Sequence, residues 1–347
     1  MRDKRSQSAN FYEATRNARR IMLLDLGFLG DSIHLFPSLW ALRQAYPNAE
    51  LHVMVSEHVA EIMKLGPWID QIWGYPRFPR RPKWHQDLAR VLKLRRTRFD
   101  AIVNLNGSDR SSLLTRLSGA PHRLGRVPDD GGPPLWRAMF THIIDHPYKK
   151  ELISTQRWRC LIESGVTGSS PEIHIEVPEA AKAGIAEKVG PDGGWIHISP
   201  FATSDYKELP AGQLSELLRG LHRQQPDKKI VLTCAPNERE RSKMNSLLAS
   251  LDFTPWRVFA GDLGLLELAA LVQSSCLHIG GDSGGLHIAW VTGVPTVTWF
   301  REYSGLPDWR PLGPKHLDVV GKRTPSGVVG IETGELHQKI SAILKSL

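Results

Sequence analysis

The sequence predicts an α/β protein with two Rossmann-like domains, each built around a parallel, doubly wound sheet. Three observations support this. The 347 residues exceed the usual size of one domain. A short apolar run at 20–26 passes through glycines into a helical pattern at 32–46. The same alternation of strand and helix begins again near residue 195.

The remaining elements follow from hydrophobic periodicity and turn residues. In the first half, runs at 49–55 and 99–105 are bounded by Pro47-Asn48 and Asn106-Gly107 and are typical of strands. In the second half, strands are expected at 195–200, 228–234, 276–280 and 295–300, a helix at 211–224 and an amphipathic helix at the end of the sequence. A Ser/Pro-containing stretch at 165–172 places the domain boundary near residue 175. We therefore expect a basic N-terminal arm at 1–20 and domains at 21–175 and 176–347.

Composition indicates the compartment. The three cysteines are widely separated and odd in number, which argues against a disulfide framework or a zinc site and favours a reducing compartment. The apolar stretch after the basic N-terminus is interrupted by Asp25 and Asp31, and no run of about 18 apolar residues follows. We expect a cytoplasmic protein.

Charge is unevenly distributed. The formal net charge is +8, and the segment 77–98 carries nine Lys or Arg against one acid, Asp87. Such a segment attracts phosphate-bearing partners, namely nucleic acid, an anionic lipid surface or a phosphorylated glycan. A solvated helix face is the alternative interpretation.

The segment GDSGGLHIAW at 281–290 is the first motif that carries chemistry. It follows a strand and opens a helix, where free backbone N–H groups can bind phosphate oxygens. Ser283 can add a hydroxyl, Gly284 and Gly285 permit close approach, and Asp282 can accept a hydrogen bond from a donor hydroxyl. The alternative is that Asp282 only caps the helix and that His287 is an ordinary helix residue.

Extended to residue 300, this segment resembles the signature of glycosyltransferase family 9, the heptosyltransferases. The residues that match are Asp282, Ser283, Gly284, His287, Ala289, Gly293 and Pro295. Trp290 replaces an alanine of the usual pattern, and Arg301-Glu302 replaces its final Gly-Pro. The turn that binds phosphate is therefore kept, whereas the next loop differs.

The segment 23–47 resembles the opening motif of the same family. The matching residues are Gly30, Asp31, Pro37, Leu42, Arg43 and Pro47. The resemblance implies that Asp31 is the general base that removes a proton from the acceptor hydroxyl during an inverting transfer. The alternative is that Asp31 only caps the helix beginning at Ser32.

The segment 197–210 resembles a third family motif, with Leu209 in place of a tryptophan. The resemblance implies that Lys207 lies against the donor diphosphate and neutralises charge on the leaving group, so Lys207 joins Asp31 as a catalytic residue. A surface lysine is the alternative. Glu238 aligns with the acid that holds the donor ribose, and Glu240 is expected to be solvated. The donor-binding residues implied are Gly30, Thr203, Ser204, Glu238, Asp282, Ser283, Gly284, Gly285 and His287.

The resemblance also implies the GT-B fold, with the two Rossmann-like domains facing each other across a cleft. The acceptor would bind 21–175 and the nucleotide sugar 176–347, without a metal or a cofactor. Anionic groups of the acceptor would meet Arg77, Arg80, Arg81, Lys83 and Arg110, because the planar guanidinium suits phosphate and carboxylate. Prolines at 76, 79 and 82 predict a loop for the first three arginines.

The function implied is transfer of a heptose from ADP-L-glycero-D-manno-heptose to the inner core of lipopolysaccharide. The expected partners are the nucleotide sugar, an anionic lipid-linked glycan and the cytoplasmic face of the inner membrane as a peripheral contact, and nucleic acid is not expected. A family member with another sugar or acceptor is the first alternative. A non-catalytic nucleotide or nucleic-acid binder is the second, although the basic segment lacks regularly interleaved aromatic residues. A dehydrogenase is disfavoured because GFLGDS lacks the G-x-G-x-x-G spacing.

Overall fold

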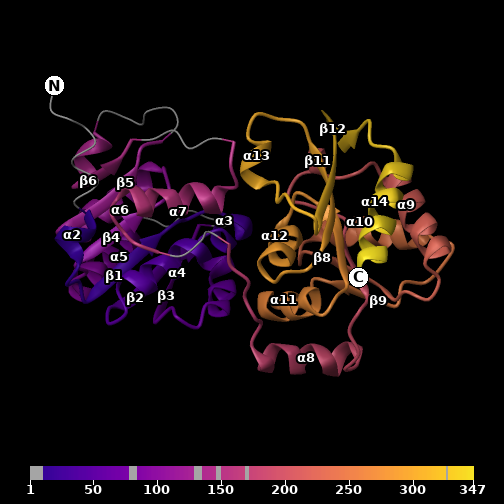
Figure 1. Ribbon diagram of the computed structural model, residues 1–347, viewed down its shortest axis with the longest axis horizontal. Helices are drawn as coiled ribbons and strands as arrows, with labels where there is room; N and C mark the ends of the chain where they lie inside the picture. Colours follow the sequence, from indigo (N-terminus) through magenta and orange to yellow (C-terminus); the bar gives the residue numbers. More distant parts are fainter. Residues whose placement is uncertain (1–10, 78–83, 129–134, 146–149, 169–171, 326) are drawn as a thin grey trace. The chain divides into compact units, whose positions relative to one another are not determined.

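The computed structural model describes residues 11–77, 84–128, 135–145, 150–168, 172–325 and 327–347 (Figure 1). The chain divides into two compact units, Met1–Ile173 and His174–Leu347. The first ten residues of the expected N-terminal arm lie outside the described residues. The next five form helix α2 (Phe11–Thr15), in which Phe11 and Thr15 are buried.

The first unit contains a six-stranded parallel sheet. Its strands are β1 (Arg20–Leu24), β2 (Glu50–Ser56), β3 (Gln71–Tyr75), β4 (Ala101–Asn104), β5 (His122–Arg126) and β6 (His142–Ile144). They lie in the order β3-β2-β1-β4-β5-β6. The order reverses between β1 and β4, and such a reversal is where doubly wound sheets bind ligands.

Helices cover both faces of this sheet. They are α3 (Leu29–Ile33), α4 (Phe36–Ala45), η1 (Glu57–Leu65), α5 (Trp84–Thr97), α6 (Asp109–Leu117), η2 (Arg137–Met139) and α7 (Ile153–Glu163). The continuous helix expected over 32–46 is instead two helices, α3 and α4. Pro37 is in the first turn of α4. Because proline has no N–H to donate to a preceding turn, it favours the start of a helix over its interior.

The second unit repeats the architecture. Its strands are β7 (Ile196–Ser199), β8 (Ile230–Cys234), β9 (Arg257–Ala260), β10 (Leu277–Gly281), β11 (Thr296–Arg301), β12 (His316–Thr324) and β13 (Gly327–Val329). The order is β13-β12-β11-β10-β7-β8-β9, parallel except for β13 against β12. Here the reversal lies between β7 and β10.

The helices of the second unit are α8 (Glu179–Val189), η3 (Asp205–Lys207), α9 (Ala211–Gln224), α10 (Glu238–Ser250), α11 (Leu265–Gln273), α12 (Gly284–Val291), α13 (Leu306–Trp309) and α14 (Thr333–Ser346). Helices α9 and α14 lie side by side against the sheet (Figure 1). The apolar stripe of the terminal helix is buried there through Leu336, Ile340 and Ile343.

Two histidines pair inside the second sheet. Neighbouring strands β7 and β10 place His197 opposite His278, with 2.8 Å between their Nδ1 atoms. His197 Nε2 lies 2.9 Å from the hydroxyl of Thr233. Burial lowers the pKa of His197 to about 3 and that of His278 well below its usual value, so both rings are neutral near pH 7. A Cβ at Gly285 would lie 2.9 Å from His278 Cε1, so the start of α12 rests directly on this pair.

The three cysteines are free thiols. Within the described ranges, no helix has both the length and the apolar character needed to cross a bilayer.

Candidate functional site

The loops after β1 and β4 meet at the reversal point of the first sheet. Asp25 directly follows β1 and is fully buried. Its Oδ1 accepts hydrogen bonds from the backbone N–H of Gly27 at 2.8 Å and from Asn106 Nδ2 at 3.2 Å. This one carboxylate therefore ties the two loops together.

Arg157, from helix α7, joins Asp25 to Asp31. Its Nη2 lies 2.5 Å from Asp25 Oδ2 and 3.2 Å from Asp31 Oδ1. Its Nη1 donates to the backbone carbonyl of Asp31 at 2.6 Å. The Arg157 side chain is 5% exposed. Burial raises the pKa of Asp25 despite the opposing charge of Arg157, and the nearby Asp31 carboxylate acts in the same direction as burial.

Asp31 is anchored on both sides but not covered. One oxygen contacts Arg157, and the other accepts from the Phe28 backbone N–H at 2.9 Å, which caps α3. The side chain is 23% exposed. A Cβ at Gly27 would lie 2.3 Å from Asp31 Cβ, so glycine is required beside this carboxylate. Asp31 thus caps the helix and also keeps a carboxylate accessible, and the two interpretations do not exclude each other.

The arginines expected to bind the acceptor have different surroundings. Arg77 donates to the Leu26 carbonyl and lies 5.6 Å from the centroid of the Phe28 ring, beside the turn that holds Asp31. Arg110 donates to the Tyr75 hydroxyl at 3.2 Å and lies 4.0 Å from Asp87. Arg80, Arg81 and Lys83 lie outside the described residues. Gly30, expected to bind the donor, lies in the first unit next to Asp31.

The reversal point of the second sheet carries an ion pair. Lys207, in η3 after β7, places its Nζ 2.7 Å from Oδ2 of Asp282, which follows β10. The side chains are 23% and 8% exposed. His287 Nε2 lies 3.8 Å from Asp282 Oδ1. Burial acts to raise the pKa of Asp282, but the His287 hydrogen bond and the Lys207 charge outweigh it and hold the pKa at about 2.

The start of α12 lies beside this ion pair. Ser283 is its N-cap, and the Ser283 Oγ is buried and has no hydrogen-bond partner within the described part of the chain. Gly284 and Gly285 follow as the first helical residues. A Cβ at Gly281 would lie 2.9 Å from the Lys207 carbonyl, so glycine allows the two loops to approach. The N–H groups at the start of a helix have no intrahelical partners, and such groups are suited to anions.

Aromatic side chains border the same turn. Tyr303 packs against Leu286, Phe300 and Leu306, and burial raises its pKa. The Trp309 ring meets His287 edge-on with 5.7 Å between centroids. Sequence reasoning missed Tyr303 and Trp309, because they follow β11 in the segment that departs from the family pattern.

Two glutamates in the first turn of α10 were predicted to have different surroundings. Glu240 was expected to be solvated, and this is wrong. It is buried, its Oε2 accepts from the Ala235 N–H at 2.8 Å, and its Oε1 accepts from Asn237 at 3.2 Å. Its carboxylate therefore stabilises the β8–α10 turn. Glu238, the predicted ribose ligand, is exposed at the first position of α10.

The remaining predicted donor residues are in the loop before η3. Thr203 is exposed and Ser204 is half-buried, four and three residues before Lys207. In the part of the chain that the structure describes, no group of three or more His, Cys, Asp or Glu side chains is placed to hold a metal ion.

Comparison with known proteins identifies the family. The model of glycosyltransferase family 9 (heptosyltransferase) matches residues 88–330, most of the chain. The chain belongs to glycosyltransferase family 9. The matched range includes the two motifs that contain Lys207 and Asp282.

Relatives support the assignment over nearly the whole length. Lipopolysaccharide heptosyltransferase 3 of Escherichia coli is 24% identical over 294 residues, which cover 82% of this chain and 84% of the relative. The structure of E. coli ADP-heptose lps heptosyltransferase II aligns with a TM-score of 0.75 at 19% identity, covering 94% of this chain and 99% of that one. The E. coli heptosyltransferase WaaC with ADP gives 0.74 at 18% identity, covering 93% and 99%. The chain therefore has the GT-B fold of these family 9 enzymes.

Removing the charge of Lys207 is expected to destabilise the second unit. In Lys207→Met the Asp282 carboxylate stays buried without its cation, which should cost about 3 kcal/mol at pH 7 in urea denaturation. At pH 4 the deficit should shrink, because protonation of Asp282 removes the unpaired charge.

The double variant Lys207→Met/Asp282→Asn should recover most of the loss. Lys182→Met removes an exposed pair with Glu179 and serves as the control, with a change below about 0.5 kcal/mol. An equal loss in Lys182→Met and Lys207→Met would contradict the structural role of the buried pair.

Proposed function

We propose that this family 9 glycosyltransferase is an inverting heptosyltransferase that transfers a heptose from ADP-L-glycero-D-manno-heptose to the inner core of lipopolysaccharide. The observation that carries the proposal is the partly exposed Asp31 carboxylate, fixed at the reversal point of the first sheet by Arg157 and the Phe28 N–H. A base for the acceptor hydroxyl needs such an accessible carboxylate in a defined orientation. The named relatives support the choice of heptose and acceptor.

The proposed reaction is a single in-line displacement. Asp31 takes the proton of the acceptor hydroxyl as its oxygen attacks the anomeric carbon of the donor. The bond from that carbon to the diphosphate oxygen breaks, and ADP leaves with the bonding electron pair. Attack from the face opposite the leaving group inverts the anomeric configuration.

The second unit supplies the donor side. The N–H groups at the start of α12, with Ser283, are suited to the diphosphate oxygens, and a solved relative contains ADP. Thr203, Ser204 and Glu238 border the same edge of the sheet as candidate contacts for the rest of the nucleotide sugar. The residues present suffice for binding and proton transfer, so we propose no metal and no cofactor.

The first unit supplies the acceptor side. Arg77 lies beside the turn of Asp31, and Arg110 lies on α6 beside Tyr75. With Arg80, Arg81 and Lys83 they would bind phosphate and carboxylate groups of the lipid-linked glycan. We propose that the enzyme works in the cytoplasm and meets the inner membrane only peripherally, through its acceptor.

A family 9 enzyme with another nucleotide sugar or acceptor is the second candidate. Trp290 and Arg301-Glu302 favour it, because they depart from the family pattern beside the donor turn. Assaying transfer from ADP-, GDP-, UDP- and dTDP-sugars to truncated lipopolysaccharide separates the two. Turnover only with ADP-heptose supports the first candidate, and turnover only with another donor excludes it. A purely nucleotide- or nucleic-acid-binding protein would show no transfer with any donor.

Replacing Asp31 by asparagine should abolish most of the activity. Asp31→Asn keeps the size of the side chain but cannot accept the proton, so turnover should fall about a hundredfold or more. Binding of ADP by calorimetry should stay unchanged, since the donor side lies in the other unit. Asp227→Asn, at an exposed position between α9 and β8, is the control. Near-normal transfer by Asp31→Asn would remove this residue from the role of base.

Substitution of Arg157 and substitution of Asp25 should shift the acid limb of the pH–rate profile in opposite directions. In Arg157→Gln the carboxylates of Asp25 and Asp31 face each other without the cation, which favours protonation and shifts the limb to higher pH. In Asp25→Asn the charge of Arg157 is no longer shared with a second carboxylate, so it stabilises ionised Asp31 more strongly and the limb shifts to lower pH. Initial rates of transfer measured from about pH 5 to 9 would give both shifts.

Among the described residues, further charged or titratable groups in this part of the unit include Arg77, His58 of η1 and the buried His34, and neither substitution replaces them. A merely structural role for Arg157 would lower the melting temperature and leave the position of the acid limb unchanged. Shifts of the same sign in the two variants would also contradict the charge argument.

A further inference from the structure

Four side chains of the second unit form an alternating stack of arginine and tyrosine. The guanidinium carbon of Arg323, from β12, lies 4.2 Å from the centroid of the Tyr206 ring. The guanidinium carbon of Arg301, the last residue of β11, lies 5.0 Å from the same ring and 4.0 Å from that of Tyr303. Arg301 is therefore held between two aromatic rings, which restrains its position.

Within the described residues, the charge of Arg301 has no counter-ion. Among the residues that the structure describes, the Arg301 guanidinium makes no ion pair and no hydrogen bond, and its Nε is buried without an acceptor. A buried N–H left without a partner is costly, and a guanidinium can only donate. A surface arginine stacked on a tyrosine would keep its donors in water, so the stacking alone does not account for the buried Nε.

Arg301 lies at the donor edge of the sheet. Tyr206 directly precedes Lys207 in η3. Tyr303 packs on Leu286 of α12, and the charge of Asp282 influences its pKa. Strands β10 and β11 are neighbours with Gly281 opposite Trp299, so Arg301 and Asp282 both lie just beyond that pair at the same edge. The arginine thus borders the turn that carries Ser283.

Lys207 shares its charge with a carboxylate at this edge. Lys207, expected to neutralise the donor, is already paired with Asp282 at 2.7 Å. The pair contributes no net charge to an incoming ligand. A nucleoside diphosphate carries several negative charges, which a helix start compensates only partly. The unpaired cation of Arg301 is available for the remainder.

We propose that Arg301 binds the diphosphate of the nucleotide donor and provides positive charge in addition to that of Lys207, which is shared with Asp282. The inference rests on the donor side of the proposed function, but it is independent of which base or sugar the donor carries. Arg301 stands where the family pattern has glycine, so this contact distinguishes the chain from relatives that follow the pattern. Its planar donors suit two phosphate oxygens at once.

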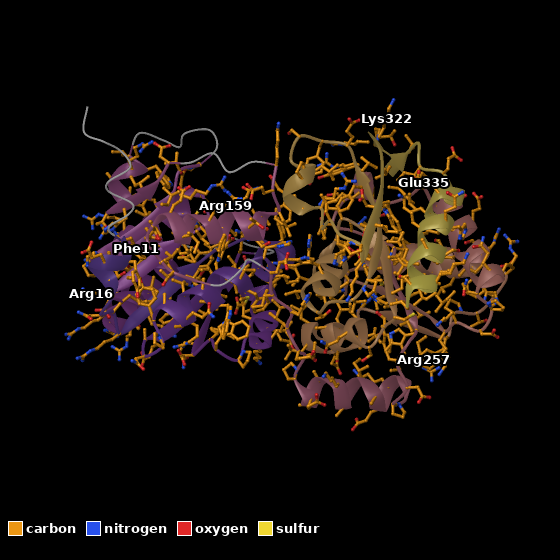
Figure 2. The ribbon with its side chains drawn as sticks, viewed as in Figure 1. Phe11, Arg16, Arg159, Arg257, Lys322 and Glu335 are labelled. Carbon is orange, nitrogen blue, oxygen red and sulfur yellow. The ribbon has the colours of Figure 1, made fainter. Side chains whose placement is uncertain are left out.

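The test is calorimetric titration of the full chain with ADP, AMP and adenosine. Arg301→Gln should bind ADP at least roughly tenfold more weakly than the unmodified protein and adenosine equally well, because one charge-assisted contact to phosphate is lost. Arg301→Lys should give an intermediate loss, since it keeps the charge but not the planar group. Arg257→Gln removes another arginine stacked on an aromatic ring, Trp256, at the opposite end of the strands, and should leave ADP binding unchanged (Figure 2).

Each outcome decides the proposal. Unchanged ADP affinity in Arg301→Gln would overturn it, and so would an equal loss for ADP and adenosine, since that indicates distorted packing. Melting curves identify a variant that does not fold, and Arg301→Lys then carries the test. If the unmodified protein prefers UDP, GDP or dTDP to ADP, the proposed donor is wrong, and the role of Arg301 is tested with the diphosphate that binds. Binding of none of the four would overturn both.

Discussion

Each sheet reverses its order between its first and fourth strands, and both half-sites depend on this constraint. The crossover helices depart to opposite faces at that point, so the loops after the two strands diverge and leave a crevice between them. In the first unit Asp25 and Asn106 close it, and in the second Lys207 and Asp282 do. In both units, polar side chains therefore join the two loops at the carboxyl ends of these strands.

Arg157 shows how the fold keeps two carboxylates close together. Burying Asp25 beside Asp31 is unfavourable unless a cation lies between them, and a buried ion pair adds little net stability over apolar packing. Its value is therefore geometric. The guanidinium contacts both carboxylates and the backbone of the turn, so the position of Asp31 is fixed by a helix that ends the first unit.

The sequence was sufficient to predict the elements with clear hydrophobic periodicity and the glycine turns. The strands expected at 20–26, 49–55, 195–200 and 228–234 correspond to β1, β2, β7 and β8, and the GT-B fold is confirmed by the family 9 structures. The position of Pro37 was visible, yet the break before it was not predicted. Arg157 is 126 residues from Asp31, and nothing in its local sequence indicates the contact. Glu240 was expected to be solvated, whereas its backbone partner, the Ala235 N–H, comes within reach only when the turn folds.

The histidine pair beneath α12 should make the stability of the second unit sensitive to acid. In an unfolded chain both imidazoles would take up protons below about pH 6.5, but the folded second unit holds them neutral. The free energy of unfolding therefore does not depend on these two groups above that pH. It declines as the solution becomes more acidic, because only the unfolded chain gains protons. His278 packs against Gly285, so we expect acidification to destabilise the start of α12.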